Sequence, residues 1–150
     1  MRAVVQRVAR ARVCSEGREI GSIGRGLVVL LGIAPDDGPD DRDWLIKRIL
    51  GQKLFDDAGG GMALDVIAAG GRLLVVSQFT LFASTRKGSR PSWHRAATPA
   101  VAIPIYEDFL ASLAAASGQV VERGAFGAEM EVELTNSGPV TLILDSRARE

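Results

Sequence analysis

The sequence predicts a single α/β domain, and three observations support that prediction. Segments with the alternation or the continuous apolar character of strands recur along the chain, at residues 1–13, 19–24, 26–34, 70–82, 119–123, 129–136 and 140–145. Two further segments, 39–52 and 99–117, have the features of helices. No linker, repeat or low-complexity block divides the 150 residues, a length that suits one domain, 1–150, with a substantial core.

The segment 70–82, GGRLLVVSQFTLF, is expected to form the central strand. A Gly-Gly turn precedes a run that is apolar on both faces, as in a strand buried on both sides. Ser77, Gln78 and Thr80 interrupt this run near its end. Polar side chains at the end of a core strand are costly unless they find partners. They either bond to neighbouring backbone or form the floor of a ligand pocket, and the residues alone leave both open.

The N-terminal segment alternates over residues 1–13, and one arginine interrupts its apolar face. That face consists of Ala3, Val5, Ala9, Ala11 and Val13, with Arg7 among them. An inward arginine needs an acceptor. Arg7 therefore either meets a carboxylate or carbonyl, or lies at a bulge that turns it outward.

The two helical segments differ in how clearly they are marked. Segment 39–52 has acidic residues in its first turns and an apolar stripe that includes Leu45 and Ile49. Segment 99–117 is rich in alanine and ends before Gly118, but Pro104 interrupts it. Because proline disrupts a helix interior, the regular helix is expected to begin only at Pro104 if it does not span the whole segment.

The segment 84–95 is basic, rich in turn residues and contains one tryptophan. Eighteen Lys and Arg balance eighteen Asp and Glu in the whole chain, so any contact with a polyanion must be local. The mixture at 84–95 suits phosphate contacts and stacking on a base or ribose. The alternative is that segment 84–95 is a solvated surface loop. The segment directly follows the strand that ends in polar residues, and this position favours a role in ligand binding.

Composition excludes several other classes of protein. The single cysteine, Cys14, excludes an internal disulfide and favours a reducing compartment. With one histidine and scattered carboxylates, no metal-ligand spacing is present. No signal-peptide core or apolar run near 18 residues is evident, so a cytoplasmic protein without a membrane partner is expected.

Two separated motifs, SQFTL at 77–81 and NSGPVT at 136–141, resemble those of the D-aminoacyl-tRNA deacylase family. The likeness covers the whole length and includes MRAVVQRV at 1–8, TRKG at 85–88, RPS at 90–92 and FGA at 126–128. Trp93-His94 departs from the family pattern, where phenylalanine and a variable residue are usual, and so does Pro104.

The resemblance implies hydrolysis of the ester bond of D-aminoacyl-tRNA, and of glycine wrongly attached to the tRNA for alanine, while L-aminoacyl-tRNA is spared. It also implies a mostly antiparallel, barrel-like sheet with two main helices, in a homodimer with composite sites. Each site would take strand 77–81 from one chain and a Gly138-cis-Pro139 turn from the other. The partners would be the acceptor end of aminoacyl-tRNA and a second copy, not DNA, and no cofactor is implied.

The residues argue against a side-chain nucleophile. A serine or threonine nucleophile needs a base within hydrogen-bond reach, but no acidic residue neighbours Ser77 or Thr80 in sequence, and His94 lies in the basic loop. Backbone N–H groups around 78–80 are expected to stabilise the oxyanion, and the 2′-hydroxyl of the RNA to assist water. Thr80 as a nucleophile is the alternative.

The candidate residues form three groups. The catalytic group is Thr80, Ser77 and Gln78; the substrate-binding group is Phe79, Gly138, Pro139, Met130 and Arg7; the tRNA-binding group is Arg86, Lys87, Arg90 and Arg95. Arg7 is expected to hold the Gly138-Pro139 turn through its carbonyls. Two rival functions remain: a module that binds the tRNA 3′ end without cleaving it, and a small-molecule esterase. The esterase ranks last because the chain has no Gly-x-Ser-x-Gly elbow.

Overall fold

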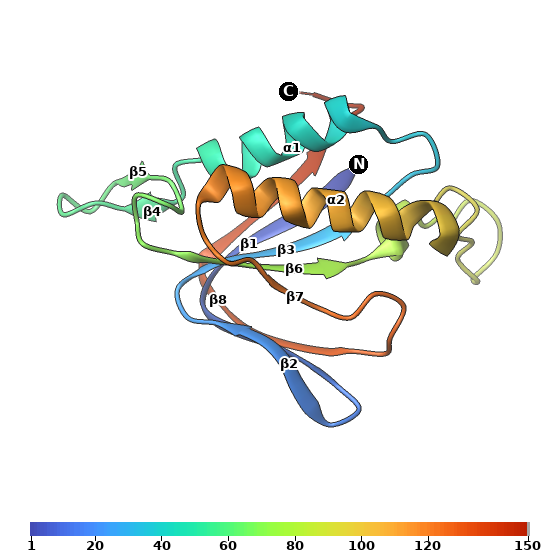
Figure 1. The fold of residues 1–150 in the computed structure, drawn as a ribbon, viewed down its shortest axis with the longest axis horizontal. Coiled ribbons are helices and arrows are strands. Elements are labelled where there is room, and N and C mark those ends of the chain that lie inside the picture. The colour runs from blue at the N-terminus through green and yellow to red at the C-terminus, as the bar shows by residue number, and fades with distance from the viewer. Residues whose placement is uncertain (150) are drawn as a thin grey trace.

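The computed structural model describes residues 1–149, with both main helices over one face of a sheet (Figure 1). Its elements are, in order, β1 (Arg2–Ser15), β2 (Arg18–Ile23), β3 (Gly26–Gly32), α1 (Pro39–Gly51), β4 (Phe55–Asp56), β5 (Met62–Leu64), β6 (Arg72–Ser77), the 3-10 helix η1 (Phe79–Phe82), α2 (Pro99–Ser117), β7 (Glu122–Arg123) and β8 (Glu131–Asp145). The short strands β4 and β5 form a separate hairpin.

The long strand β1 organises the sheet. One edge of β1 pairs antiparallel with β8, while its other edge pairs first with β3 and then with β2. The β3–β6 and β6–β7 pairs are parallel. At the far end β2 approaches β7, where a Cβ placed on Gly21 would lie 2.9 Å from the Arg123 carbonyl oxygen. The predicted barrel-like sheet is confirmed, and it is mixed because of the two parallel pairs.

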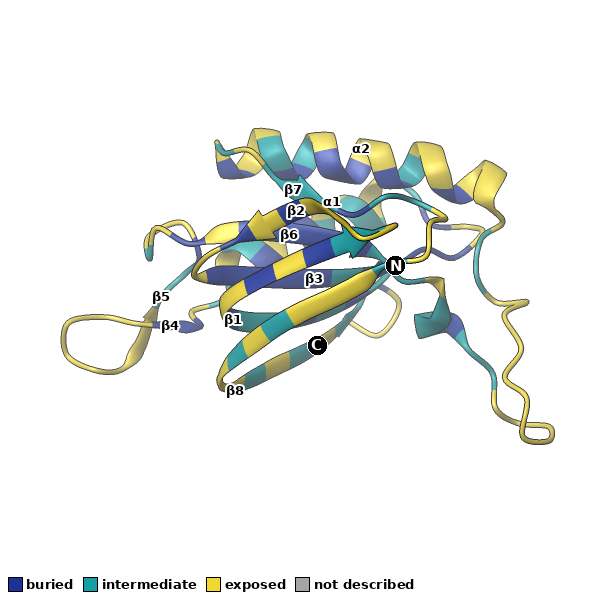
Figure 2. Cartoon of the chain, turned by 90° about the horizontal axis from the view of Figure 1, so that it is seen from below, coloured by how far each residue is buried: buried dark blue, intermediate teal, exposed yellow. Residues whose placement is uncertain are grey.

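Two apolar cores lie on opposite sides of this sheet. The larger core lies between the sheet and the helices and contains Phe55, Tyr106 and Phe109. The smaller one lies within the rolled sheet and contains Val8, Ala11, Val13, Ile23, Val28, Leu74 and Val76. Buried residues concentrate on β3 and β6, whereas β8 has only intermediate and exposed residues (Figure 2).

The helix α2 runs without interruption from Pro99 to Ser117, so the predicted helix 99–117 is confirmed and the alternative of a regular start only at Pro104 is wrong. Pro104 lacks the N–H that would bond to the carbonyl of Ala100. Both residues are exposed, so that carbonyl faces solvent and needs no protein partner. The helix ends at Gly118, which adopts the left-handed conformation with φ of 66°.

By length and hydropathy alone, α2 could cross a membrane, which the sequence analysis did not anticipate. Its inner face packs Tyr106, Phe109 and Leu113, all fully buried, into the larger core. Its outer face carries Glu107, which pairs with Arg123, and Asp108, which pairs with Arg42. This is the pattern of a core helix with a charged outer face.

The burial pattern of β1 changes beside Arg7. Ala3, Val5, Ala11 and Val13 are buried as predicted, but Ala9 is exposed and Val8 is buried in its place. The pairing of β1 with β8 shifts register on both sides of Val8, which displaces the alternation.

The strand β8 is one continuous element where two separate strands, over 129–136 and 140–145, were predicted. Both halves pair with the same strand, because Asn136 lies opposite Val8 and Thr141 opposite Gln6. The four residues between them therefore stand opposite Arg7 alone, as an extruded bulge.

Candidate functional site

A cleft of about 430 Å³ opens where β6 ends, between η1, the start of α2 and the 126–127 loop. Its walls are mostly apolar and consist of Leu31, Ile33, Ser77, Gln78, Phe79, Trp93, His94, Ala96, Ala97, Thr98, Pro99, Ala102, Phe126 and Gly127. An apolar cleft with a few polar groups is the usual form of a small-ligand site.

The polar end of the central strand leaves the sheet, which corrects the prediction of a strand over 77–81. β6 ends at Ser77, and residues 79–82 form the 3-10 helix η1. The N–H of Gln78 donates to the Leu31 carbonyl at 2.7 Å, the last bond to the neighbouring strand. Gly32 then lets η1 pack closely, since a Cβ there would lie 3.1 Å from the Gln78 carbonyl oxygen.

The structure separates the three candidate catalytic side chains. Ser77 and Gln78 line the cleft, whereas Thr80 does not. The Thr80 hydroxyl instead accepts a hydrogen bond from the Gln78 amide. Among the described residues that line the cleft, none carries a carboxylate. The ring of His94 bonds through Nδ1 to the Ser92 hydroxyl at 3.0 Å, and among the described residues no base is hydrogen-bonded to the hydroxyl of Ser77 or Thr80.

Two backbone donors lie at the start of η1. In any helix the first N–H groups have no partner within the helix. The first internal bond here is Leu81 N–H to the Gln78 carbonyl, at 3.2 Å. The N–H groups of Phe79 and Thr80 donate to no backbone carbonyl within residues 1–149. This pair of main-chain donors can bind a developing oxyanion.

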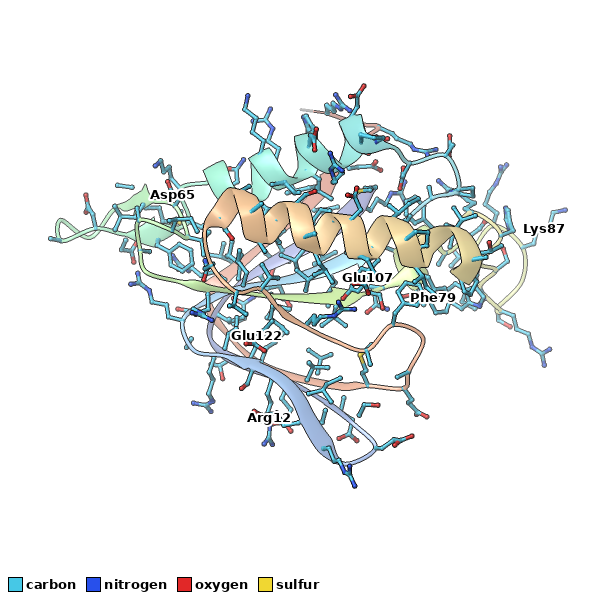
Figure 3. All side chains as sticks on the ribbon, viewed as in Figure 1. Arg12, Asp65, Phe79, Lys87, Glu107 and Glu122 are labelled. Atoms are coloured by element: carbon cyan, nitrogen blue, oxygen red, sulfur yellow. The ribbon has the colours of Figure 1, made fainter. Side chains whose placement is uncertain are left out.

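Aromatic side chains flank these donors. Phe79 and Trp93 meet edge to face, with ring centroids 5.4 Å apart, and stay 54% and 41% exposed. Phe126 is a third aromatic residue that lines the cleft. Figure 3 shows Phe79 beneath the N-terminal end of α2, at the same end of the molecule as Lys87. Exposed aromatic rings at a cleft mouth are suited to stacking on a nucleobase.

Trp93 and His94, expected only as part of the basic loop, also line the cleft, a position that the sequence did not predict. The Ala97 N–H donates to the Ile33 carbonyl at 2.9 Å, which holds the end of this loop beside β3. That contact joins residues far apart in the sequence. The one available signal was the departure of Trp93-His94 from the family pattern.

The four candidate tRNA-binding residues fall into two places. Arg86, Lys87 and Arg90 are exposed on a loop closed by backbone bonds between Ser84 and Ser92. Arg95 lies apart from them and lines a second cavity.

The turn at Gly138-Pro139 is exposed, and its peptide bond is cis, as expected from the resemblance. Gly138 has φ of 136°, in the region that favours glycine. Arg7 donates to the Ser137 carbonyl at 2.9 Å and also to the Leu54 carbonyl. The sequence left two alternatives for Arg7, a carbonyl or carboxylate partner or a position at a bulge. The structure shows both, because Arg7 has carbonyl partners and lies at a bulge.

This turn and the cleft lie apart in one chain. Arg7, which contacts the turn, pairs with Leu27 at the start of β3. Ser77, which lines the cleft, pairs with Leu31 of the same strand. The separation is about 13 Å along the strand, from a rise of about 3.3 Å per residue. Neither Gly138 nor Pro139 lines the cleft. Met130 does not line it either, and packs against the smaller core.

Comparison with known proteins gives a consistent result. The family model described as D-Tyr-tRNA(Tyr) deacylase matches residues 4–145. Proteins named D-aminoacyl-tRNA deacylase from Bacteroides thetaiotaomicron, Opitutus terrae and Chromobacterium violaceum are 49%, 51% and 49% identical, each over all of both chains.

Two solved structures share the fold. One, titled c-Myc DNA Unwinding Element Binding Protein, is 38% identical with a TM-score of 0.90, covering 97% of this chain and 98% of that one. The other, titled as a probable eukaryotic D-amino acid tRNA deacylase, is 17% identical with a TM-score of 0.81, covering 95% and 97%. At that lower identity the likeness concerns the fold alone.

Proposed function

The chain belongs to the D-Tyr-tRNA(Tyr) deacylase family, and from that premise we propose that it hydrolyses the ester bond of D-aminoacyl-tRNA at the cleft beside η1. A hydrolase of this class is what the family and the names of the relatives support. The structural observation that carries the proposal is a pair of successive N–H groups, of Phe79, which lines the aromatic cleft, and of Thr80, the next residue, neither of which donates to a backbone carbonyl within residues 1–149.

The chemistry rests on the main chain and on the substrate. Water attacks the ester carbonyl carbon, and the N–H groups of Phe79 and Thr80 hold the oxygen that becomes negative. The bond to the ribose 3′-oxygen then breaks, and that oxygen takes a proton. The neighbouring 2′-hydroxyl of the terminal adenosine assists the proton transfers, since no carboxylate lines the cleft within the described residues and the imidazole of His94 there is hydrogen-bonded to Ser92. Ser77 and Gln78 position the substrate.

Selection by chirality is assigned to the Gly138-Pro139 turn of a second copy. The turn is exposed, lies apart from the cleft of its own chain and has no Cβ at Gly138. Its backbone can therefore approach the α-carbon of the substrate closely and collide with an L side chain. Glycine has no side chain to collide, so glycine on the tRNA for alanine is also a substrate. Arg7 holds the turn through the Ser137 carbonyl.

A homodimer follows from this assignment, and the exposed surface of β8 supports it. β8 pairs on one edge with β1, and no other strand within residues 1–149 pairs with it. It also carries Ile143, which is 78% exposed. An unpaired edge beside exposed apolar side chains is suited to association with another chain.

Turnover by the purified chain tests the proposal. D-aminoacyl-tRNA should lose its amino acid over many cycles, while the L-aminoacyl form stays intact. Binding without turnover would identify a module that only holds the tRNA 3′ end. Equal cleavage of small esters that lack adenosine would identify the chain as a small-molecule esterase. The aromatic cleft and the basic loop make that function less suitable than hydrolysis of aminoacyl-tRNA.

A further inference from the structure

A second cavity, of about 420 Å³, lies next to the cleft. It is lined by Arg2, Ala34, Phe82, Arg95, Asp145, Arg147 and Ala148, so three arginines and one aspartate contribute to its wall. The two cavities share a wall. Ile33 lines the cleft and Ala34 the cavity, and likewise His94 lines the cleft and Arg95 the cavity.

Two of the three arginines are fixed in place. Arg2 donates from Nε to Asp145 at 2.6 Å and from an amino group to the Leu81 carbonyl at 3.1 Å, with its guanidinium 4.8 Å from the centre of the Phe82 ring. Arg147 pairs with Asp36 and Asp37. A guanidinium has five N–H donors, so each of these two arginines keeps donors for a further acceptor.

Arg95 differs from both, because it makes no hydrogen bond, ion pair or ring contact within residues 1–149. Its charge is therefore uncommitted at the edge of a cavity whose other arginines are already oriented. Guanidinium groups are well matched to phosphate, which accepts several hydrogen bonds at once.

We propose that the cavity lined by Arg2, Arg95 and Arg147 binds the phosphodiester on the 5′ side of the terminal adenosine. The proposal rests on the proposed function, which places that adenosine in the cleft across the shared wall. The bound phosphate fixes the register of the acceptor strand, so that the ester reaches the N–H groups at the start of η1. This site is distinct from the exposed loop that carries Arg86, Lys87 and Arg90.

The test compares two substrates that differ in phosphate. D-tyrosyl-tRNA carries the phosphodiester, whereas the D-tyrosyl ester of adenosine has none. Arg95→Ala should lower kcat/KM on the tRNA substrate roughly tenfold or more, the effect of losing a hydrogen bond to a charged group. It should leave the nucleoside ester unchanged, and Arg95→Lys should retain part of the rate.

Arg18→Ala is the matched control, because Arg18 is exposed at the start of β2 and its side chain has no partner within the described residues. If it lowers the tRNA rate as much as Arg95→Ala does, the effect is one of overall charge and the proposal is wrong. An equal loss on the nucleoside ester would likewise overturn it, by placing Arg95 at the reacting group.

Binding measurements separate this proposal from the proposed function. Adenosine 5′-monophosphate should bind the unmodified protein more tightly than adenosine, and Arg95→Ala should remove that advantage. Equal binding of the two by the unmodified protein would contradict the phosphate site. If the unmodified protein hydrolyses neither ester, the proposed function fails, while the binding comparison still decides the phosphate site.

Discussion

At the scale of single residues, the polar groups best placed for chemistry in the cleft belong to the main chain. The hydroxyl of Thr80 accepts a hydrogen bond from the Gln78 amide, and within residues 1–149 no side-chain base is hydrogen-bonded to Ser77. The N–H groups of Phe79 and Thr80 are unpaired with backbone carbonyls of residues 1–149. Main-chain donors of this kind need geometry and no unusual pKa.

A pair of variants at residue 79 tests this directly. Phe79→Pro removes the N–H at the first position of a helix, where proline is well tolerated, and Phe79→Ala removes the ring but keeps the N–H. Loss of one oxyanion donor costs about a hundredfold to a thousandfold in kcat. Phe79→Pro should therefore be slower than Phe79→Ala by about that factor in single-turnover deacylation.

Thr80→Ala completes the comparison. It removes one neutral hydrogen bond, worth about 0.5–1.5 kcal/mol, so the rate should fall by roughly tenfold at most. Loss of a true nucleophile costs as much as about a millionfold in one protease. A trapped acyl-Thr80 species, or equal rates for the two variants at residue 79, would show that the main-chain account is wrong.

Tyr106 gives a prediction on pH. Burial raises the pKa of its phenol to about 12, and the hydroxyl donates to the Val75 carbonyl at 3.1 Å. A raised pKa favours the neutral form in the folded state. This contribution to stability is complete below the unfolded pKa of about 10 and is lost as pH rises through the folded value.

Because Tyr106 is the only tyrosine, absorbance of the phenolate reports it alone. In a titration of the native protein, the phenolate should form near pH 12. The free energy of unfolding should fall less at alkaline pH in Tyr106→Phe, because this variant has no phenol to ionise. A native phenolate that forms near pH 10 would contradict the burial assigned to α2.

At the scale of elements, local sequence patterns predicted most of the fold. The apolar run before Ser77 and the alternation at 19–24 depend on near neighbours in the sequence, and both segments are strands. The helix η1 could not be predicted this way, because it depends on Gly32 of another strand. The bulge at Arg7 likewise depends on β8, more than a hundred residues later.

The sequence predicted several of the residues that line the cleft, but it did not predict how the segments that carry them are arranged around it. Ser77, Gln78 and Phe79 line the cleft as expected, while Thr80 and Met130 do not. Trp93 and His94 reach the cleft through packing of the loop end against β3, and Arg95 leaves the basic loop for the second cavity. Contacts between distant segments decide such placements, and a single sequence contains no direct signal of them.

The parallel pairing of β3 with β6 gives a prediction at this scale. Gly26 pairs with Arg72, and a Cβ on Gly26 would overlap the Arg72 backbone. Gly26→Ala should therefore lower the free energy of unfolding by about 3 kcal/mol or more, at the upper end of overpacking costs. Gly24→Ala is the control, because nothing lies within 4 Å of a Cβ there. Equal unfolding curves for the two variants would place the strands further apart than described.

At the scale of the whole molecule, the proposed composite site needs a cleft from one chain and a turn from another. Mixing two variants tests whether the second chain is required. Phe79→Pro disables the cleft. Gly138→Ala disables the turn, since its Cβ would lie 2.9 Å from the Val140 nitrogen and 3.1 Å from an amino nitrogen of Arg7. If sites are composite, a mixed dimer contains one intact site, so an exchanged equimolar mixture should recover about a quarter of the activity. No recovery after proven exchange would mean that each chain uses its own turn.

We propose that ester hydrolysis relies on main-chain donors and on the 2′-hydroxyl of the RNA. The most direct test is single-turnover deacylation of D-aminoacyl-tRNA ending in 2′-deoxyadenosine, compared with the same tRNA ending in adenosine. The deoxy substrate should react about a hundredfold or more slowly, the size of effect expected when an assisting proton-transfer group is removed. Equal rates for the two substrates would contradict this proposal, and would return the search for the assisting group to the side chains of the protein.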